Sequence, residues 1–255
     1  KPAPISGKTV IGIVFQTNPD RIADTEKNNG FTHGYVVATH MVYDSTINDI
    51  TKKPNGYTLS YVMVSGYDDT ISGCMSDYKH SATYAWYQNI DGYTETNTIK
   101  SNLVDALKYM PLFNYGTDNF KVPAPKNTSG WFIPASGQVW DMLANLCGNE
   151  IAQYLKEQQT VTYSISYGYL NGKVSGNPID AFNEKMALVP AEQKDEFYIP
   201  DVKGLRKECP IWSSSYSGYS EGSSTGALLV IDAGSISAVD DWLDGWGFAR
   251  PILAF

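Results

Sequence analysis

Histidines and serines are the side chains that could perform nucleophilic catalysis in this chain. A nucleophile needs a base beside it and a third group that orients the base. The histidines are His33, His40 and His80, and no G-x-S-x-G elbow accompanies them. His33 opens an apolar segment, where we expect it to pack or to hydrogen-bond to a loop. We therefore expect no enzyme, although a carboxylate pair brought together by folding would still suit a glycan hydrolase.

The cysteines Cys74, Cys147 and Cys209 are far apart in the sequence. None forms a CxxC motif, so neither a zinc site nor thioredoxin-like chemistry is predicted. An odd number allows at most one internal disulfide. The simplest interpretation is that all three are reduced and partly buried, because a free cysteine packs as a small apolar side chain.

Acidic residues gather at two places that could contact a cation. One group lies within residues 68–77, and the other comprises Asp240, Asp241 and Asp244. Calcium takes about six to eight oxygen ligands, but neither group has the spacing of an EF-hand loop. We favour solvated loop charge, keep Asp240, Asp241 and Asp244 as the candidate metal ligands, and expect no cofactor.

An excess of aromatic side chains is the feature most suited to ligand binding. The chain has 18 Tyr and 6 Trp. An aromatic face stacks on the apolar face of a sugar ring, and rigid aromatics also favour protein contacts. Trp131, Trp140 and Trp212 fall on expected strands or helices, so we assign them to the core. The candidates for ligand binding lie in expected loops: Tyr84, Trp86, Tyr87, Tyr216, Tyr219, Trp242 and Trp246.

The composition is that of one folded domain. The chain has 255 residues, 22 of them Gly, and only 18% are charged, which suits a compact fold with ordered loops rather than disorder. The net charge is −8 and no basic run is longer than two residues, so no nucleic-acid partner is expected. No stretch of about 18 apolar residues exists, so we expect no membrane span. We expect a single domain over residues 1–255, with 1–6 as a linker remnant.

Hydrophobic periodicity predicts the elements that must position these side chains. Residues 7–15 are β-branched and apolar on both faces, as in a central strand. The apolar C-terminal segment should pair with that strand, since an unpaired apolar end is an aggregation hazard. Further strands are expected at 33–39, 57–64, 130–134, 160–170, 211–215 and 226–232, and helices at 97–110, 136–147, 150–158 and 180–188.

Turn-forming residues predict where these elements end. Pro111 should end the first helix and Gly148 the second. Asn171-Gly172 is a hairpin signal. Residues 66–97 are expected to form a long ordered loop, and the serine-rich stretches 213–215 and 217–224 a flexible polar turn.

Three segments resemble a known family. Gly130-Trp-Phe-Ile-Pro-Ala-Ser-Gly-Gln-Val-Trp140 is similar to the GW-x-LP-S-x-x-E/Q-W segment of C-type-lectin-like domains in a bacterial family of unknown function, frequent in exported Bacteroidetes proteins. Ile211-Trp-Ser-Ser-Ser215 resembles its YWSSSE strand, and Ala249-Arg-Pro-Ile-Leu-Ala-Phe255 resembles its terminal VRPVLAF. The order and spacing agree over nearly the whole chain. The calcium-dependent sugar-binding motifs of true lectins are absent.

The resemblance implies an α+β, C-type-lectin-like fold, with two main helices, long ordered loops and a small twisted sheet closed by the N- and C-terminal strands. In such a fold Cys147 and Cys209 could approach one another, and a disulfide suits an exported protein. Fold alone does not give function.

We expect an exported domain at the cell surface, or anchored to the outer membrane through a segment outside this chain. It would be non-catalytic and would bind a glycan or a host or surface protein, in an adhesive role. The alternative is a structural module of a fimbrial appendage or a lipoprotein that contacts sister subunits, perhaps by addition of its terminal strand. An enzyme acting on carbohydrate is the third hypothesis.

Overall fold

The computed structural model of the protein describes residues 7–42, 60–61, 86–102, 111–159, 170–197, 208–220, 223–242 and 246–255. The helices are α1 (Asp24–Asn28), α3 (Gly92–Asn102), α4 (Pro111–Tyr115), α5 (Ser136–Leu146), α6 (Asn149–Gln158) and α7 (Pro178–Lys185), with short 3-10 turns at η1 (Pro19–Arg21), η2 (Trp86–Gln88), η4 (Met186–Leu188) and η5 (Ala191–Gln193). The strands are β1 (Gly12–Gln16), β2 (Tyr35–Ala38), β3 (Ser60–Tyr61), β4 (Leu170–Lys173), β5 (Cys209–Ser220), β6 (Ser223–Ile231), β7 (Ser235–Trp242), β8 (Trp246–Gly247) and β9 (Ile252–Ala254).

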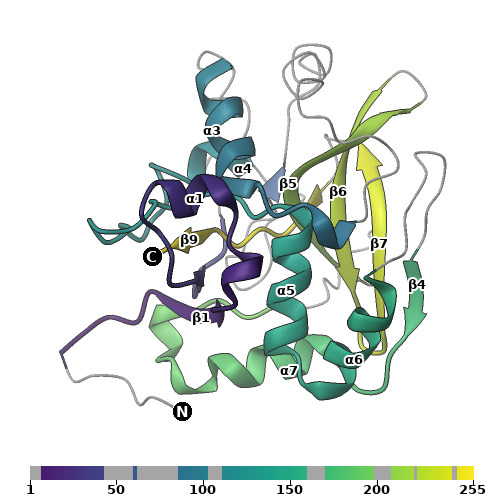
Figure 1. The fold of residues 1–255 in the computed structure, drawn as a ribbon. Coiled ribbons are helices and arrows are strands. Elements are labelled where there is room, and N and C mark those ends of the chain that lie inside the picture. The colour runs from purple at the N-terminus through teal and green to yellow at the C-terminus, as the bar shows by residue number, and fades with distance from the viewer. Residues whose placement is uncertain are drawn as a thin grey trace.

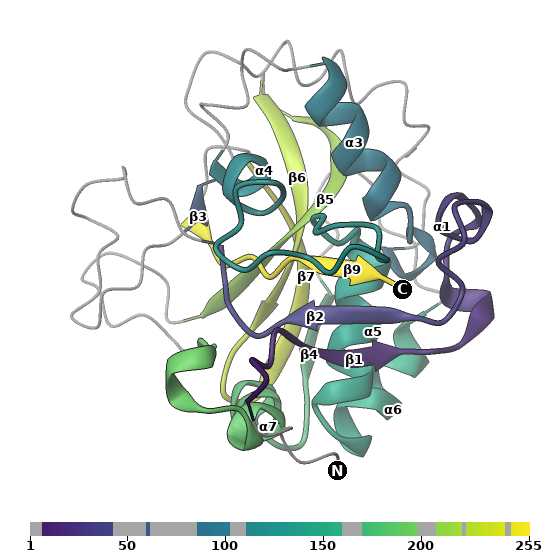
Figure 2. The ribbon, with the colours of Figure 1, turned by 90° about the vertical axis from the view of Figure 1, so that its left-hand side faces the viewer.

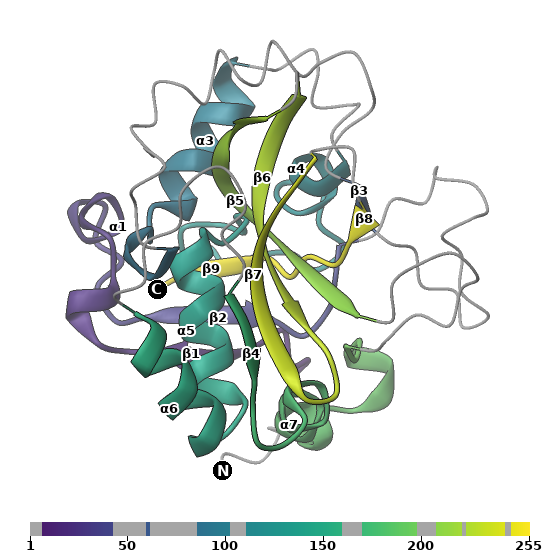
Figure 3. The same ribbon diagram turned by 90° about the vertical axis from the view of Figure 1, so that its right-hand side faces the viewer.

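Antiparallel pairing joins these strands into three sheets within the described part of the chain. Their orders are β1-β2-β9, β3-β8 and β4-β7-β6-β5. Figure 2 shows β1, β2 and β9 side by side with α5 and α6 behind them, and Figure 3 shows the twisted four-stranded sheet on the other side of α5. The protein is therefore a mixed fold of helices and small antiparallel sheets, as the α+β prediction requires (Figure 1).

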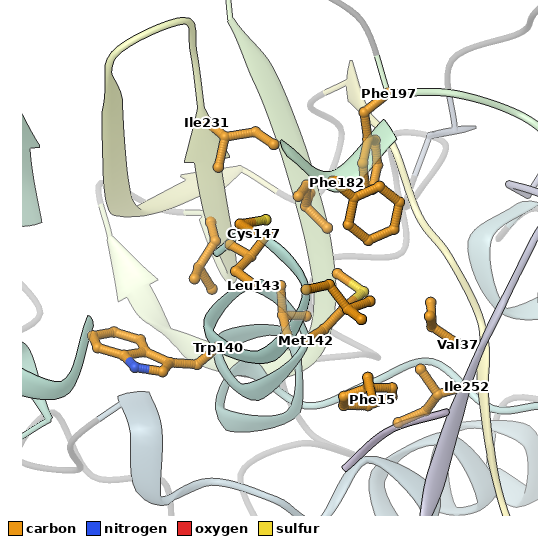
Figure 4. Close-up of a cluster of buried hydrophobic side chains, with 14 of the residues drawn as sticks. Phe15, Val37, Trp140, Met142, Leu143, Cys147, Phe182, Phe197, Ile231 and Ile252 are labelled. Atoms are coloured by element: carbon orange, nitrogen blue, oxygen red, sulfur yellow. The ribbon is translucent and has the colours of Figure 1, made fainter. Parts of the chain in front are cut away.

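Helix α5 lies between the two larger sheets and carries the centre of the core. Its apolar residues recur at helical spacing and are buried, Trp140 and Leu143 among them. Figure 4 shows Leu143 between Phe15 and Ile252 on one side and Ile231 on the other, with Trp140 at the left of the same cluster. Residues from both ends of the chain thus share one buried cluster, which gives the molecule a continuous core.

The C-terminal strand is paired on both of its edges, but not with the strand that the sequence suggested. Strand β9 pairs with β2, and β2 in turn pairs with β1. On its other edge, Phe132 exchanges two backbone hydrogen bonds with Ile252, each 2.9 Å long. The prediction that residues 7–15 form a central strand paired with the C-terminus is therefore wrong. Strand β1 begins at Gly12, lies at the edge of its sheet, and leaves Val14 48% exposed.

Several other elements fall where periodicity placed them. Helices α5, α6 and α7 and strands β2, β5 and β6 agree with their predicted positions to within a few residues at most ends, while β5 and β6 extend beyond them. Gly148 follows α5 with φ of 93°, the left-handed conformation for which glycine is favoured after a helix.

Turn-forming residues misplaced several of the predicted element boundaries. Pro111 begins α4, since the first helical position needs no backbone N–H. The end of the helix predicted before it lies outside the described residues. Asn171 and Gly172 lie inside β4, opposite Ser237 and Ile236 of β7, so the predicted hairpin turn is wrong. Strand β7 itself was not predicted. The segment 130–134 forms one bridge rather than a strand.

The structure also differs from the prediction at the serines of residues 213–215, which are buried. Ser213, Ser214 and Ser215 are 4%, 1% and 4% exposed within β5, so the prediction of a flexible polar turn there is wrong. Their hydroxyls find partners inside the protein; Ser213 Oγ, for example, donates to the carbonyl oxygen of Ala227 at 2.6 Å. Hydrogen bonding of this kind makes burial of polar groups affordable.

No helix in the part of the chain that the structure describes is long and apolar enough to cross a membrane.

A candidate ligand-binding hollow on helix α3

A shallow hollow opens to solvent beside helix α3, where α1 packs against it. Its volume is about 260 Å³. Pockets for small molecules start at roughly 300 Å³, so the hollow would take a small ligand or one unit of a longer one. None of the described side chains that line it carries a formal charge. They are Thr25 of α1 and Tyr93, Thr94, Asn97, Thr98 and Ser101 of α3.

The helical repeat explains why α3 supplies most of this lining. Tyr93, Asn97 and Ser101 recur every four residues and therefore share one face of the helix. Thr94 and Thr98 repeat at the same interval beside them. The face is thus a continuous stripe of hydroxyl and amide groups that ends at one aromatic ring.

Packing fixes the aromatic ring at the end of this stripe. The ring of Tyr93 meets that of Phe132 nearly edge-on, with centroids 5.6 Å apart and planes at 79°. Thr94 Oγ1 donates to Thr25 Oγ1 at 3.1 Å, which ties α3 to α1. Among the described residues, neither the Tyr93 phenol nor the Asn97 side-chain amide forms a hydrogen bond, so both can serve a ligand.

A buried polar cluster anchors the opposite face of α3. Glu95 is 1% exposed and accepts hydrogen bonds from Asn89 Nδ2 at 2.8 Å, from Ser215 Oγ at 3.4 Å and, through a short contact, from Ser214 Oγ. Ser215 Oγ also accepts from the backbone N–H of Ser136 at 2.9 Å. One carboxylate therefore connects α3 with strand β5 and with the start of α5, and a fully paired network of this kind rigidifies its surroundings.

Two glycines allow these elements to approach so closely. A Cβ at Gly92, the first residue of α3, would lie 2.5 Å from the backbone nitrogen of Ala135 and 2.7 Å from the carbonyl oxygen of Ile133. A Cβ at Gly137, in the first turn of α5, would collide with the carbonyl oxygens of Tyr87 and Asn89. Within the Gly130–Trp140 segment, Gly137 is thus required by close backbone contact.

Tyr87, one of the predicted ligand-binding aromatics, is half-buried and has a structural partner. The guanidinium carbon of Arg21 lies 3.7 Å from the centroid of its ring. Arg21 also donates to Asp141 Oδ2 and to the Tyr87 carbonyl oxygen, each at 2.8 Å. Burial raises the pKa of Asp141, and the Arg21 charge works against that rise. Tyr87 therefore helps to hold η1 against α5.

Most of the other predicted ligand-binding aromatics lie in short helical turns or strands of the backbone. The backbone of Trp86 begins η2, and that of Trp246 begins β8. Tyr216 and Tyr219 lie in β5 and Trp242 lies in β7, so the prediction that these three occupy loops is wrong. Tyr84 lies outside the described residues.

Two of the three candidate metal ligands lie in strand β7. Asp240 and Asp241 lie in β7, paired with Ala227 and Gly226, and Asp244 falls outside the described residues. Where the structure describes the chain, no group of three His, Cys, Asp or Glu could hold a metal ion. Cys147 and Cys209 share the buried core and no disulfide joins them, so the disulfide that the resemblance allowed is not formed. Burial raises the pKa of Cys147 to about 12, as in an inert structural thiol.

Sequence reasoning missed Tyr93 as the centre of a site, because residues up to 97 were expected to form a loop. Helix α3 in fact begins at Gly92. The interval of four residues between Tyr93, Asn97 and Ser101 is the signal that could have found this face.

A second buried polar group, around Arg250, ties the C-terminal segment to the rest of the fold. Arg250 is 0% exposed; its Nη1 donates to the Thr39 carbonyl oxygen at 2.7 Å and its Nη2 to that of Asp195. The guanidinium carbon lies 4.5 Å from the centroid of the Phe197 ring. The arginine of the terminal segment is therefore a structural connector between β2, the 195–197 segment and the C-terminus.

The carboxylate of Asp195 is itself surrounded by donors. Its Oδ2 accepts from the Met41 backbone N–H at 2.9 Å and from Lys121 Nζ at 3.2 Å, and lies 3.0 Å from His40 Nδ1. Burial lowers the pKa of Lys121, and the Asp195 charge opposes that effect. His33, by contrast, stacks on Phe255 with ring centroids 6.0 Å apart. Both described histidines therefore have structural contacts.

Comparison with known proteins supports a fold but no family. The sequence matches no known protein family and no curated protein. The structure is similar to the crystal structure of a fimbrial protein from Bacteroides ovatus ATCC 8483, with a TM-score of 0.53 and 15% sequence identity. The match covers 100% of this chain and 46% of that protein. The chain thus spans less than half the length of its structural neighbour, and the likeness concerns the fold alone.

Proposed function

We propose that this chain is a module of an exported cell-surface appendage, of the fimbrial kind. The observation that carries the proposal is the structural likeness to a fimbrial protein, which extends over the whole of this chain. The length of that neighbour also fits a module that works with further domains. In this proposal the partners are sister subunits of the same appendage, and the chain is anchored to the cell through a segment outside residues 1–255.

The finer fold in this proposal is C-type-lectin-like. Two features support it. Strands β1 and β9, near the two ends of the chain, lie in one small sheet around β2. Helix α5 packs between that sheet and a larger twisted one. Superposition of this fold on lectin-like domains tests the assignment, and a better match to an unrelated sandwich fold would contradict it.

A binding role rather than catalysis is also part of the proposal. The support is that His40 and Asp195 are engaged in holding β2, and that Glu95 is engaged in anchoring α3. Strand addition through the C-terminus is not included, because β9 is hydrogen-bonded on both edges. The edge strand β1, where Val14 is exposed, is the better candidate for a contact between subunits.

Fractionation of intact cells of the organism that encodes the chain tests this function. Antibodies raised against the purified chain should detect it in the material released by mechanical shearing, and protease added outside the cells should remove it. A cytoplasmic protein of known location serves as the control for lysis. Recovery of the chain only from inside protease-treated cells would refute the proposal.

A further inference from the structure

We propose that the hollow between α1 and α3 binds a neutral carbohydrate unit, with Tyr93 as the stacking surface and Asn97 as the hydrogen-bonding group. This goes beyond the role in an appendage, and either can fail without the other.

The chemistry of the lining favours a neutral polyhydroxylated ligand. An aromatic ring presents an apolar face, while Thr, Ser and Asn offer both donors and acceptors at short range. The lining residues that the structure describes carry no charge, although the chain as a whole carries −8. A charged ligand would find no counter-ion among these six side chains, whereas sugar hydroxyls need none.

The two groups assigned to the ligand have no competing partners. The Asn97 amide and the Tyr93 phenol form no hydrogen bond within the described part of the chain. Both line the hollow and lie one helical turn apart. One can therefore contact a ring face while the other reaches a hydroxyl of the same ligand.

The hollow is also held rigid before a ligand arrives. Tyr93 rests on Phe132, Thr96 is hydrogen-bonded to both the N–H and the carbonyl oxygen of Ile133, and Glu95 is held by the β5 serines. These contacts fix α3 from its buried side, so the exposed side loses little conformational freedom on binding. Such preorganisation matters most for weak, small ligands.

Titration of the ¹⁵N-labelled chain by NMR tests the proposal directly. The probes are glucose, galactose, mannose, fucose, N-acetylglucosamine and N-acetylgalactosamine, each added up to the order of tens of millimolar. We expect at least one of them to shift the amide signals of Thr25 and of residues 93–101 in a saturable way, with millimolar affinity. Failure of all six to shift those signals, or saturable shifts confined to other parts of the protein, would overturn the proposal.

Matched variants assign the binding to the hollow. Asn97→Ala should weaken binding by about three- to tenfold, as expected for one lost hydrogen bond, while Asn119→Ala, the same change at an exposed residue elsewhere, should bind like the wild type. Tyr93→Leu keeps an apolar side chain on Phe132 but removes the ring, and should weaken binding by about three- to tenfold. If Tyr93→Leu does not fold, Asn97→Ala decides alone, and wild-type affinity in that variant would contradict the assignment.

Discussion

Single buried carboxylates show at the residue scale how differently this protein treats its charges. Glu95 is surrounded by hydroxyl and amide donors, whereas Glu26 is also fully buried and its Oε1 receives a side-chain hydrogen bond at 3.1 Å from the Tyr35 hydroxyl. Within the described part of the chain, Glu26 Oε2 has no partner. Burial raises the pKa of Glu26 to about 7; Asp91 adds to the rise, and Lys27 and the hydrogen bonds oppose it.

The raised pKa of Glu26 makes stability depend on pH. The unfolded side chain ionises near pH 4.5 and the folded one near 7, so the folded state holds the proton more tightly. The contribution of protonated Glu26 to the free energy of unfolding is complete below about pH 4.5 and is lost as the pH rises through 7. The loss lowers the free energy of unfolding by about 2–4 kcal/mol. Urea unfolding at pH 5 and pH 8 should show this loss, and Glu26→Gln, which cannot ionise, should be the more stable protein at pH 8.

The control for this prediction is Glu157→Gln, which removes an exposed carboxylate of α6. It should change stability by no more than about 0.5 kcal/mol at either pH. Equal pH dependence in the wild type and in Glu26→Gln would show that Glu26 is not the group responsible.

Arg250 is the residue whose loss should harm the fold most. Arg250→Met leaves the carbonyl oxygens of Thr39 and Asp195 without their buried donor, and breaking such a network costs about 3–5 kcal/mol. Lys100→Met breaks an ion pair with Asp118, which is 81% exposed, and should cost less than about 1 kcal/mol. Chemical denaturation of both variants compares them, and similar small losses would contradict the structural role of Arg250.

At the scale of elements, the approach of η2 to α5 depends on Gly137. Gly137→Ala should destabilise the protein by about 1–3 kcal/mol, because the new methyl group must displace backbone carbonyl groups. Gly234→Ala is the matched control, since nothing lies within 4 Å of its Cβ position. Thermal unfolding of the two variants measures the difference, and equal melting temperatures would refute the close contact.

Elements with a strong apolar repeat could be predicted from the sequence, and those defined by long-range pairing could not. Helix α5 carries its own pattern, so its position was clear. The neighbours of β9 are β2 and Phe132, and no local feature of the C-terminus encodes that choice. Asn171-Gly172 has the composition of a turn, but pairing with β7 overrides that local preference.

The same distinction applies to the candidate site. Aromatic content predicted which side chains could bind a ligand, but the exposure of each aromatic ring depends on tertiary packing. Tyr87 is occupied by Arg21, whereas Tyr93 faces the hollow. Residues 213–215 belong to a predicted strand and were also expected to form a polar turn. The sequence could not show that Ser214 and Ser215 are buried, because their partner, Glu95, lies more than a hundred residues away in the chain.

On the scale of the whole molecule, one large buried cluster and a C-terminal strand paired on both edges tie the two ends of the chain together. The likeness to a fimbrial protein covers all of this chain and less than half of that protein, and the proposed module rests on that likeness. The hollow is lined by residues of α1 and α3, whereas the proposed subunit contact uses the edge strand β1. The two proposals therefore assign a sugar and a sister subunit to different elements.

Immunogold electron microscopy of intact, unpermeabilised cells tests the central claim most directly. We predict gold particles along or at the ends of filaments outside the cell when antibodies against this chain are used, and their loss when the gene is deleted. Labelling that appears only after permeabilisation, with none on external structures, would contradict the proposed place in a surface appendage.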